Sequence, residues 1–443
     1  MKRTPVDGLT ARRLALQDYM TRAELEWAQL LALRTTLEHA ANHSPFYTTH
    51  LGSLAKGLPG SLSDLPTLPF LSRDHIIDQG HLMLSVSQSK VARIITMQTS
   101  GSTGTPKRLA FSAKDLASTS DFFLHGMYSL VGRTDRVLVL LPFELPASVG
   151  ELLIAALGAD SIICEGMWPP VPGEEVARRI RSGGFSCAVG LPQHLLALSA
   201  MVGDGQLKSM LLCSDYAPAA LRRRIEENCG CETFLHYGAT ESGLGGAVEC
   251  GAHDGCHIRE SELLIEIIDP KSGKVLPDGE CGEVVLTTLG REAMPLIRYR
   301  TGDMASLDRS GCSCGGVTAR LKNIRGRMER CLLSSGALLY SQDIDEYLFE
   351  VPGLLDYRVS LATAETTGAD RLELEFQALA GSGRIADELV LSLGQVPAIR
   401  AGLAATTLEL GAVRQVAAFA AVHTQKRTII DQRTQGEIHA PCS

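Results

Sequence analysis

The sequence is poor in aromatic residues, and it lacks both a long apolar run and a long block of lysine and arginine. A helix that crosses a bilayer needs roughly 18 or more consecutive apolar residues. No stretch approaches that length, so we predict no membrane span. A nucleic-acid-binding protein usually carries a basic face. The formal net charge of -8 and the absence of a basic block therefore argue against nucleic acid as a partner.

The opening residues, MKRTPVDGLT, lead into charged helical sequence and not into the apolar core of a signal peptide. We therefore expect a cytoplasmic protein. Hydrophobic residues make up 45% of the chain and charged residues 21%, which is typical of a folded globular protein. Because 443 residues exceed one ordinary hydrophobic core, we predict at least two domains.

Strand and helix patterns alternate through the first half of the chain. Apolar residues at helical spacing predict a helix over 22–41. Short apolar runs predict strands at 136–142, 160–166 and 185–192, and helical segments at 149–159 and 176–183 separate them. Strands that alternate with helices require crossover connections, so we predict an α/β fold with a largely parallel sheet.

The pattern changes after about residue 260. Residues 262–270 and 282–289 are apolar strands on either side of a Gly/Pro/Asp turn, which predicts a small β-meander subdomain. After residue 327, a helix at 341–353 and alternating strands at 356–364 and 371–380 predict a compact α+β module. We therefore predict a large N-terminal domain over 1–327 and a small C-terminal domain over 328–443.

Residues 97–109, MQTSGSTGTPKRL, concentrate hydroxyls, glycines and one lysine. Glycine lets the backbone approach a phosphate closely, hydroxyls and backbone N–H groups donate to its oxygens, and Lys107 adds a cation. The spacing differs from that of P-loop NTPases, because Thr105 and Pro106 separate the second glycine from the lysine. A flexible Ser/Gly turn is the alternative interpretation of the composition alone.

The order TSGSTGTPK resembles the phosphate-binding signature of the adenylate-forming superfamily. That superfamily includes acyl- and aryl-CoA ligases, luciferases and the adenylation domains of peptide synthetases. The resemblance implies that the phosphates of ATP are bound by Thr99, Ser100, Gly101, Ser102, Thr103, Gly104 and Lys107.

Residues 236–245, HYGATESGLG, resemble the aromatic–Gly–x–Thr–Glu motif of the same superfamily. The resemblance implies that Tyr237, followed by Gly238, stacks on adenine and that Thr240 binds a phosphate. Glu241 would hold Mg²⁺, because a carboxylate is a hard ligand for a hard cation. Without the motif, a glutamate in a Gly-rich loop would be a solvated turn residue.

Three further segments follow the order of the superfamily. CSDYAP at 213–218 takes the place of its adenine-contacting loop and implies roles for Asp215 and Tyr216. YRTGD at 299–303 implies that Asp303 accepts hydrogen bonds from the ribose hydroxyls. IRGRMER at 324–330 resembles the hinge region, where Arg327 would reach ribose or phosphate and Glu329 would mark the hinge between the domains.

Residues 422–433, VHTQKRTIIDQR, look like the terminal lysine segment of the superfamily, although its glycine is missing. Such a lysine completes the positive charge around the transferring phosphoryl group. Lys426 is the catalytic candidate. A strict alignment on IIDQR would shift the position by one residue and place Gln425 there.

Twelve cysteines are many for a cytoplasmic protein. We interpret Cys164, Cys187 and Cys213 as small buried apolar side chains. ECGAHDGCHI at 249–258 and CSCGG at 312–316 contain four thiols and two imidazoles, which suit tetrahedral zinc. A redox-active cluster and plain reduced cysteines are the alternatives.

Members of the phenylacetate–CoA ligase branch carry a similar Cys…His…Cys-x-Cys cluster. The resemblance implies a structural zinc ion on Cys250, His257, Cys312 and Cys314, with Cys256 and His253 in reserve.

The likeness to that branch extends over about residues 20–435. It implies an enzyme that uses ATP and Mg²⁺ to convert a carboxylic acid to an acyl-AMP, releasing pyrophosphate, and then forms acyl-CoA while the small domain swings. One alternative is an adenylyltransferase of the same fold that serves a non-CoA acceptor such as a deazaflavin. Another is a non-catalytic nucleotide-binding relative. Homodimers are the commonest oligomers, so a homodimer is our expectation.

Overall fold

The computed structural model describes residues 4–17, 19–52, 54, 57–97, 106–168, 173–327, 330–379, 381, 383–417 and 427–433. The chain divides into two compact units. The first contains Met1–Leu191, Val202–Ser214 and Cys229–Arg327, and the second contains Pro192–Met201, Asp215–Asn228 and Met328–Ser443. The predicted domain boundary after Arg327 stays a prediction.

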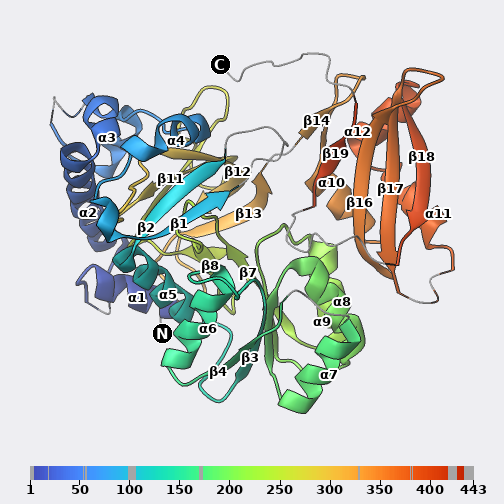
Figure 1. The fold of residues 1–443 in the computed structure, drawn as a ribbon, viewed down its shortest axis with the longest axis horizontal. Coiled ribbons are helices and arrows are strands. Elements are labelled where there is room, and N and C mark those ends of the chain that lie inside the picture. Colours follow the sequence, from blue (N-terminus) through green and yellow to red (C-terminus); the bar gives the residue numbers. More distant parts are fainter. Residues whose placement is uncertain are drawn as a thin grey trace. The chain divides into compact units, whose positions relative to one another are not determined.

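The described part of the first unit is built on one sheet in which eleven strands follow the order β10-β11-β12-β13-β9-β8-β7-β6-β5-β3-β4 (Figure 1). Neighbouring strands at the β7-to-β4 end pair in parallel, as predicted. These strands are β3 (Arg136–Leu140), β4 (Ile163–Gly166), β5 (Cys187–Gly190), β6 (Ser209–Leu212) and β7 (Glu232–Tyr237).

The crossovers of the parallel half run through helices. They include α6 (Val149–Ala159) and α7 (Gly173–Gly183), while α5 (Ala113–Met127) precedes β3. Strands β5 and β6 are buried along their whole length, because helices cover both faces of a parallel sheet. The predicted α/β architecture is therefore confirmed.

The other half of the sheet is antiparallel. The predicted meander is present and continues the same sheet through β10 (Leu263–Ile268), β11 (Cys281–Thr288), β12 (Tyr299–Asp308) and β13 (Arg320–Arg327). Two short strands, β8 (Ala247–Glu249) and β9 (Cys256–Ile258), join it to β7.

Helices precede the sheet in the chain. They are α1 (Pro5–Arg13), α2 (Arg22–His43), α3 (Pro45–His50) and α4 (Arg73–Gln79). The predicted helix corresponds to α2, which begins at a capping box formed by Thr21 and Glu24 and buries its leucine face. An antiparallel pair, β1 (Val91–Met97) and β2 (Lys107–Ser112), flanks the predicted phosphate loop, and residues 98–105 of that loop lie outside the described residues.

The second unit contains the predicted α+β module. Its four-stranded sheet has the order β18-β17-β16-β19, formed by β16 (Leu354–Thr363), β17 (Asp370–Ala378), β18 (Leu408–Gln415) and β19 (Ile429–Asp431). Helices α10 (Ser341–Leu348), α11 (Ile385–Leu393) and α12 (Pro397–Ala404) accompany the sheet, and β14 (Arg330–Leu332) pairs with β15 (Leu338–Tyr340). This unit also takes in most of α8 (Pro192–Val202) and α9 (Ala219–Cys229). Among the described residues, no helix has the length and apolarity that a bilayer crossing requires.

Candidate active site

Three segments that are distant in sequence meet at one buried carboxylate. Lys107 opens β2, Tyr299 opens β12, and Glu241 lies in the turn that follows β7. Lys107 Nζ forms an ion pair and a hydrogen bond with Glu241 Oε1. Tyr299 Oη donates to the same oxygen at 3.1 Å and lies 3.1 Å from Lys107 Nζ.

All three side chains of this cluster are withdrawn from water. The exposed fractions of Lys107, Glu241 and Tyr299 are 4%, 1% and 2%. A buried carboxylate is stable only when it is paired and hydrogen-bonded. The burial of Glu241 excludes the interpretation of this glutamate as a solvated turn residue.

The turn that carries Glu241 is fixed by its own backbone. Gly243 N donates to Thr240 O at 3.1 Å, and Ala239 N donates to Ser242 Oγ at 3.0 Å. Gly243 has φ +80°, a conformation that favours glycine. Outside the turn, Arg291 Nη1 donates to the carbonyl oxygen of Glu241 at 2.8 Å. The carboxylate therefore has a defined position.

A second polar pair lies in the same unit. Tyr237 Oη donates to Asp303 Oδ2 at 2.8 Å, and Thr301 Oγ1 accepts from Asp303 N at 3.0 Å. Burial and the negative charge of Asp303 raise the pKa of Tyr237 well above its usual range, so this phenol stays a donor. Asp303 pairs with Arg327 in the register of β12 and β13, which places two predicted ribose ligands on neighbouring strands.

The structure does not describe every predicted site residue. Residues 99–104 and Lys426 lie outside the described residues, and so does Glu329. Asp215 and Tyr216 belong to the second unit, where Asp215 Oδ2 accepts from Arg427 N at 3.2 Å and Tyr216 O accepts from Arg427 Nη2 at 2.7 Å. The residue after Lys426 is thus held by partly buried hydrogen bonds.

An apolar cavity with about 530 Å³ of empty space adjoins the Tyr237 turn. It lies at the carboxyl ends of parallel strands, where ligands bind in open α/β sheets. Its lining includes Phe122, Phe123 and Met127 of α5, Leu211 of β6, Val248 of β8, and Gly238. The sequence alone identified no such cavity.

His236 contributes an imidazole to the lining of this cavity. Burial, with the nearby charge of Arg259, lowers the pKa of His236 to about 4, so its imidazole is neutral near pH 7. His236 Nε2 is buried and has no hydrogen-bond partner among the described residues. The sequence could have pointed to His236, because side chains alternate along a strand and the residue next to Tyr237 must face the other side of β7.

Four predicted metal ligands converge in the first unit. Cys250, His257, Cys312 and Cys314 each offer one donor atom, and these atoms lie within 4.8 Å of one another. Cys250 Sγ is 3.9 Å from Cys312 Sγ, and Cys314 Sγ is 3.4 Å from His257 Nε2. Two sulfurs on a tetrahedral ion with metal–sulfur bonds of about 2.3 Å are roughly 3.8 Å apart. The donor set therefore fits such an ion.

Cys256 and His253, the two additional candidate ligands, contact other groups. Cys256 Sγ lies 3.6 Å from Leu235 O, and His253 Nδ1 lies 3.4 Å from Glu249 Oε2. Neither belongs to the four-residue group.

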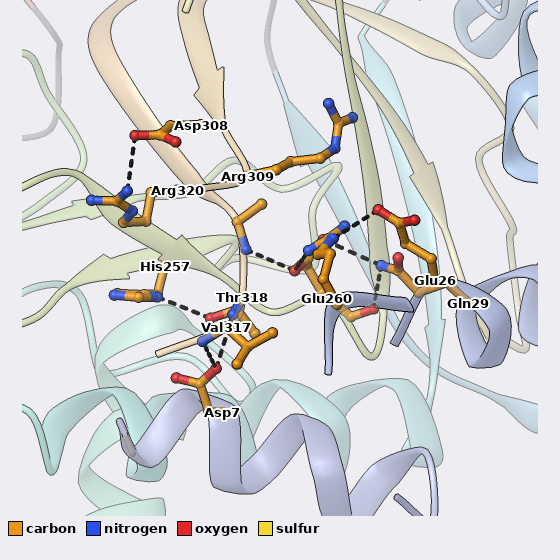
Figure 2. Close-up of polar contacts among 12 residues, drawn as sticks. Asp7, Glu26, Gln29, His257, Glu260, Asp308, Arg309, Val317, Thr318 and Arg320 are labelled. Atoms are coloured by element: carbon orange, nitrogen blue, oxygen red, sulfur yellow. Dashed lines mark hydrogen bonds and ion pairs between the residues drawn. The ribbon is translucent and has the colours of Figure 1, made fainter. Parts of the chain in front are cut away.

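Helix α1 supports His257, one residue of the cluster, through Asp7 and Thr318 (Figure 2). Asp7 Oδ1 of α1 accepts from the backbone N–H groups of Val317 and Thr318 at 2.8 and 2.9 Å. Thr318 Oγ1 lies 2.9 Å from His257 Nδ1, so it fixes the ring that presents Nε2 to the cluster. A methyl group on Gly316 would lie 2.6 Å from Asp7 Oδ2 and 2.8 Å from His257 Cε1, so the position requires glycine.

Known proteins resemble this chain over most of its length. It is 31% identical over 348 residues to phenylacetate-coenzyme A ligase of Aromatoleum evansii, which covers 75% of this chain and 77% of that protein. It is 28% identical over 407 residues to phenylacetate-coenzyme A ligase of Thermus thermophilus, with 87% and 90% covered. Residues 77–290 match the family described as AMP-binding enzyme.

The chain belongs to the phenylacetate–CoA ligase branch of the adenylate-forming enzymes. Members of this family are AMP-forming acid–thiol ligases, and the protein is accordingly an ATP-dependent carboxylic acid:CoA ligase that works through an acyl-AMP. The predicted superfamily, branch and reaction class are confirmed.

Solved structures share the fold of this ligase. A 2-hydroxyisobutyryl-CoA ligase in the postadenylation state with 2-HIB-AMP aligns with a TM-score of 0.76 and 19% identity. The alignment covers 93% of this chain and 90% of that one. The same ligase in the thioesterification state with CoA gives a TM-score of 0.63.

Proposed function

We propose that the Lys107–Glu241–Tyr299 cluster and the Tyr237–Asp303 pair form the nucleotide half of the active site, and that the apolar cavity beside Tyr237 receives the acid. This proposal rests on the position of strand β7 between the nucleotide half of the site and the apolar cavity. His236 of β7 lines the cavity, while Tyr237, the next residue, bonds Asp303. Nucleotide and acid would thus meet at the end of β7.

Each polar side chain has a role in ATP binding. The ring of Tyr237 would flank adenine, and the carboxylate of Asp303 would accept from the ribose hydroxyls. Glu241 would hold Mg²⁺, which would stabilise the negative charge of the transferring phosphoryl group when bound. Lys107 and Tyr299 hold Glu241 Oε1 in place for that task.

The first step joins the acid to AMP. A carboxylate oxygen attacks the α-phosphorus of ATP, the bond from phosphorus to the β-phosphate bridge breaks, and pyrophosphate leaves. We propose that Lys426 stabilises the charge on the transferring phosphoryl group. In the second step the thiol sulfur of CoA attacks the acyl carbon, its proton goes to solvent, and AMP leaves. A rotation of the second domain about Glu329 would switch the active site from the first step to the second.

The cavity constrains the acid. Its walls favour an apolar body, and a charged substituent would have to be buried without an ionic partner, which is costly. His236 Nε2 is a neutral, unsatisfied group in those walls. We propose an aryl or alkyl carboxylic acid with an uncharged hydrogen-bonding substituent, such as a hydroxyl, that reaches His236.

We propose a zinc ion on Cys250, His257, Cys312 and Cys314. Three thiolate ligands and one imidazole are a common structural zinc set, and all four positions are filled by protein. The ion would fix the segment before β13 and would take no part in the reaction. Reduced thiols fit the cytoplasm, which remains our prediction for the location of the protein. A homodimer likewise stays a prediction.

The acid proposal is tested by pyrophosphate release from phenylacetate and its ring-hydroxylated forms, with and without CoA. We expect a hydroxylated acid to exceed phenylacetate in kcat/KM by roughly 10-fold, because an unpaired buried group costs about 1–3 kcal/mol. His236→Phe should remove that preference, while the exposed control His43→Phe should retain it. Equal kcat/KM values for phenylacetate and its hydroxylated forms would contradict the acid proposal.

The role of Lys426 is tested by separating the two steps. Lys426→Ala should lower pyrophosphate release from acid and ATP by at least about 100-fold, because one charge-stabilising donor is lost. It should spare thioester formation from synthetic acyl-AMP and CoA. Gln425→Ala is the matched control and should retain both steps. Loss of adenylation in Gln425→Ala with an active Lys426→Ala would assign the position to residue 425 instead.

The metal proposal is tested by elemental analysis and thermal unfolding. We expect about one zinc ion per chain and its loss in Cys312→Ser. Loss of about 3 kcal/mol of stabilisation would lower Tm by roughly 6–12 °C. The control substitution Cys281→Ser, at an exposed cysteine outside the cluster, should change neither the zinc content nor Tm. A wild-type protein that is free of metal yet equally stable would contradict the proposal.

A further inference from the structure

A second cavity lies on the other side of the Glu241 turn. It has about 790 Å³ of empty space in the first unit and is lined by α1, the first turns of α5, residues 259–262 and residues 288–291. Its lining contains four cationic side chains and two carboxylates: Arg13, Lys114, Arg259, Arg291, Asp115 and Glu262. None of these groups lines the acid cavity, and Arg291 also contacts the turn of the proposed nucleotide site, through the carbonyl oxygen of Glu241.

Two buried guanidinium groups converge in this cavity. A methyl group placed on Gly243 would lie 3.0 Å from Arg291 Nη2 and 3.3 Å from Arg259 Nη2. Arg259 is 3% exposed and Arg291 is 8% exposed. Burial and repulsion from Arg259 lower the pKa of Arg291 to about 10, and burial and repulsion from Arg13 lower the pKa of Arg259.

Backbone groups hold one of the two carboxylates, and cations of the cavity pair with the other. Asp115 accepts from the backbone N–H groups of Glu292 and Ala293 at 2.8 and 3.1 Å, and from Ser112 N at 2.9 Å. Glu262 Oε1 accepts from Ser118 Oγ at 2.7 Å and lies 3.7 Å from Arg13 Nε, and Glu262 Oε2 lies 3.1 Å from Arg259 Nε. Four cations against two carboxylates leave the lining with an excess of positive charge that these pairs offset only in part.

Several polar atoms on the cavity wall are buried without a hydrogen-bond partner among the described residues, namely Arg259 Nε, Arg259 Nη1, Ser261 Oγ and Glu262 Oε2. Because Arg259 Nε and Glu262 Oε2 form an ion pair with each other, Arg259 Nη1 and Ser261 Oγ are the donors that this pair leaves unsatisfied. Ser261 is 7% exposed. Buried donors without partners are costly and uncommon, and they indicate a missing acceptor. Lys114, which is exposed, adds a cation to the lining.

We propose that this cavity binds a tetrahedral oxyanion of the phosphate type, either free or as a phosphate monoester. Guanidinium forks match the oxygens of such a group, and a hydroxyl adds a further donor. The site is coupled to the active site, because Arg291 Nη1 also donates to the carbonyl oxygen of Glu241. An anion on Arg291 therefore acts on the turn that positions Glu241.

Calorimetric titration with inorganic phosphate at constant ionic strength, with AMP at saturation, tests the proposal. We expect saturable binding that AMP does not displace. Ser261→Ala removes one donor to a charged group and should weaken binding roughly 10-fold. Lys114→Gln should weaken it in the same direction, and the exposed control Lys271→Gln should stay within about twofold of wild type.

A parallel titration with glycerol 3-phosphate distinguishes the two sources of the oxyanion. Tighter binding of the ester assigns the site to phosphorylated metabolites, and tighter binding of phosphate assigns it to the free ion. The proposal is wrong if phosphate shows no saturable binding, if AMP displaces it, or if Ser261→Ala and Lys114→Gln bind it as wild type does. None of these measurements requires an acid or CoA, so a failure of the substrate proposal would leave them interpretable.

Discussion

The buried pair of Lys107 and Glu241 is the interaction on which the rest of the site depends. It joins residues that are 134 positions apart, and Tyr299 closes the group from a third segment. Removing one member of a buried pair leaves an uncompensated charge that costs about 3–5 kcal/mol. The pair thus constrains β2, the turn after β7 and β12 to one arrangement, and that arrangement leaves an anionic oxygen in a defined place.

Two adjacent residues of strand β7 contribute to two different sites. Because side chains alternate along a strand, Tyr237 and His236 serve opposite faces. The phenol of Tyr237 bonds Asp303, whereas the imidazole of His236 lines an apolar cavity. The nucleotide and the acid that we propose as ligands would therefore bind at opposite faces of one short strand. Arg291 extends the same network toward the second, cationic cavity.

Much of the fold and part of the site could be predicted from the sequence. Alternating apolar runs predict the parallel half of the sheet, and the motifs around Tyr237, Glu241 and Asp303 identify side chains that the structure places in one unit. These signals are local, so they can be read along the chain. The Cys/His cluster was also predictable, because ligand type and short spacing carry its chemistry.

The remaining features depend on contacts between distant segments. The sequence does not reveal that Lys107 pairs with Glu241, nor that Arg259 and Arg291 converge on Gly243. The acid cavity is likewise assembled from α5, α6 and the ends of four strands, none of which is distinctive alone. His236 belongs to a recognisable motif, yet only the three-dimensional structure shows that it is buried and that its Nε2 has no hydrogen-bond partner in the described part of the chain.

The role of Glu241 can be measured by isotope exchange between ATP and pyrophosphate in the presence of an accepted acid. With Glu241→Gln, the carboxylate loses its charge while its shape is kept. The account predicts that exchange falls by at least about 100-fold and that higher Mg²⁺ concentrations partly restore it. Exchange at the wild-type rate in this variant would contradict the assignment of Glu241, and with it the position of the nucleotide.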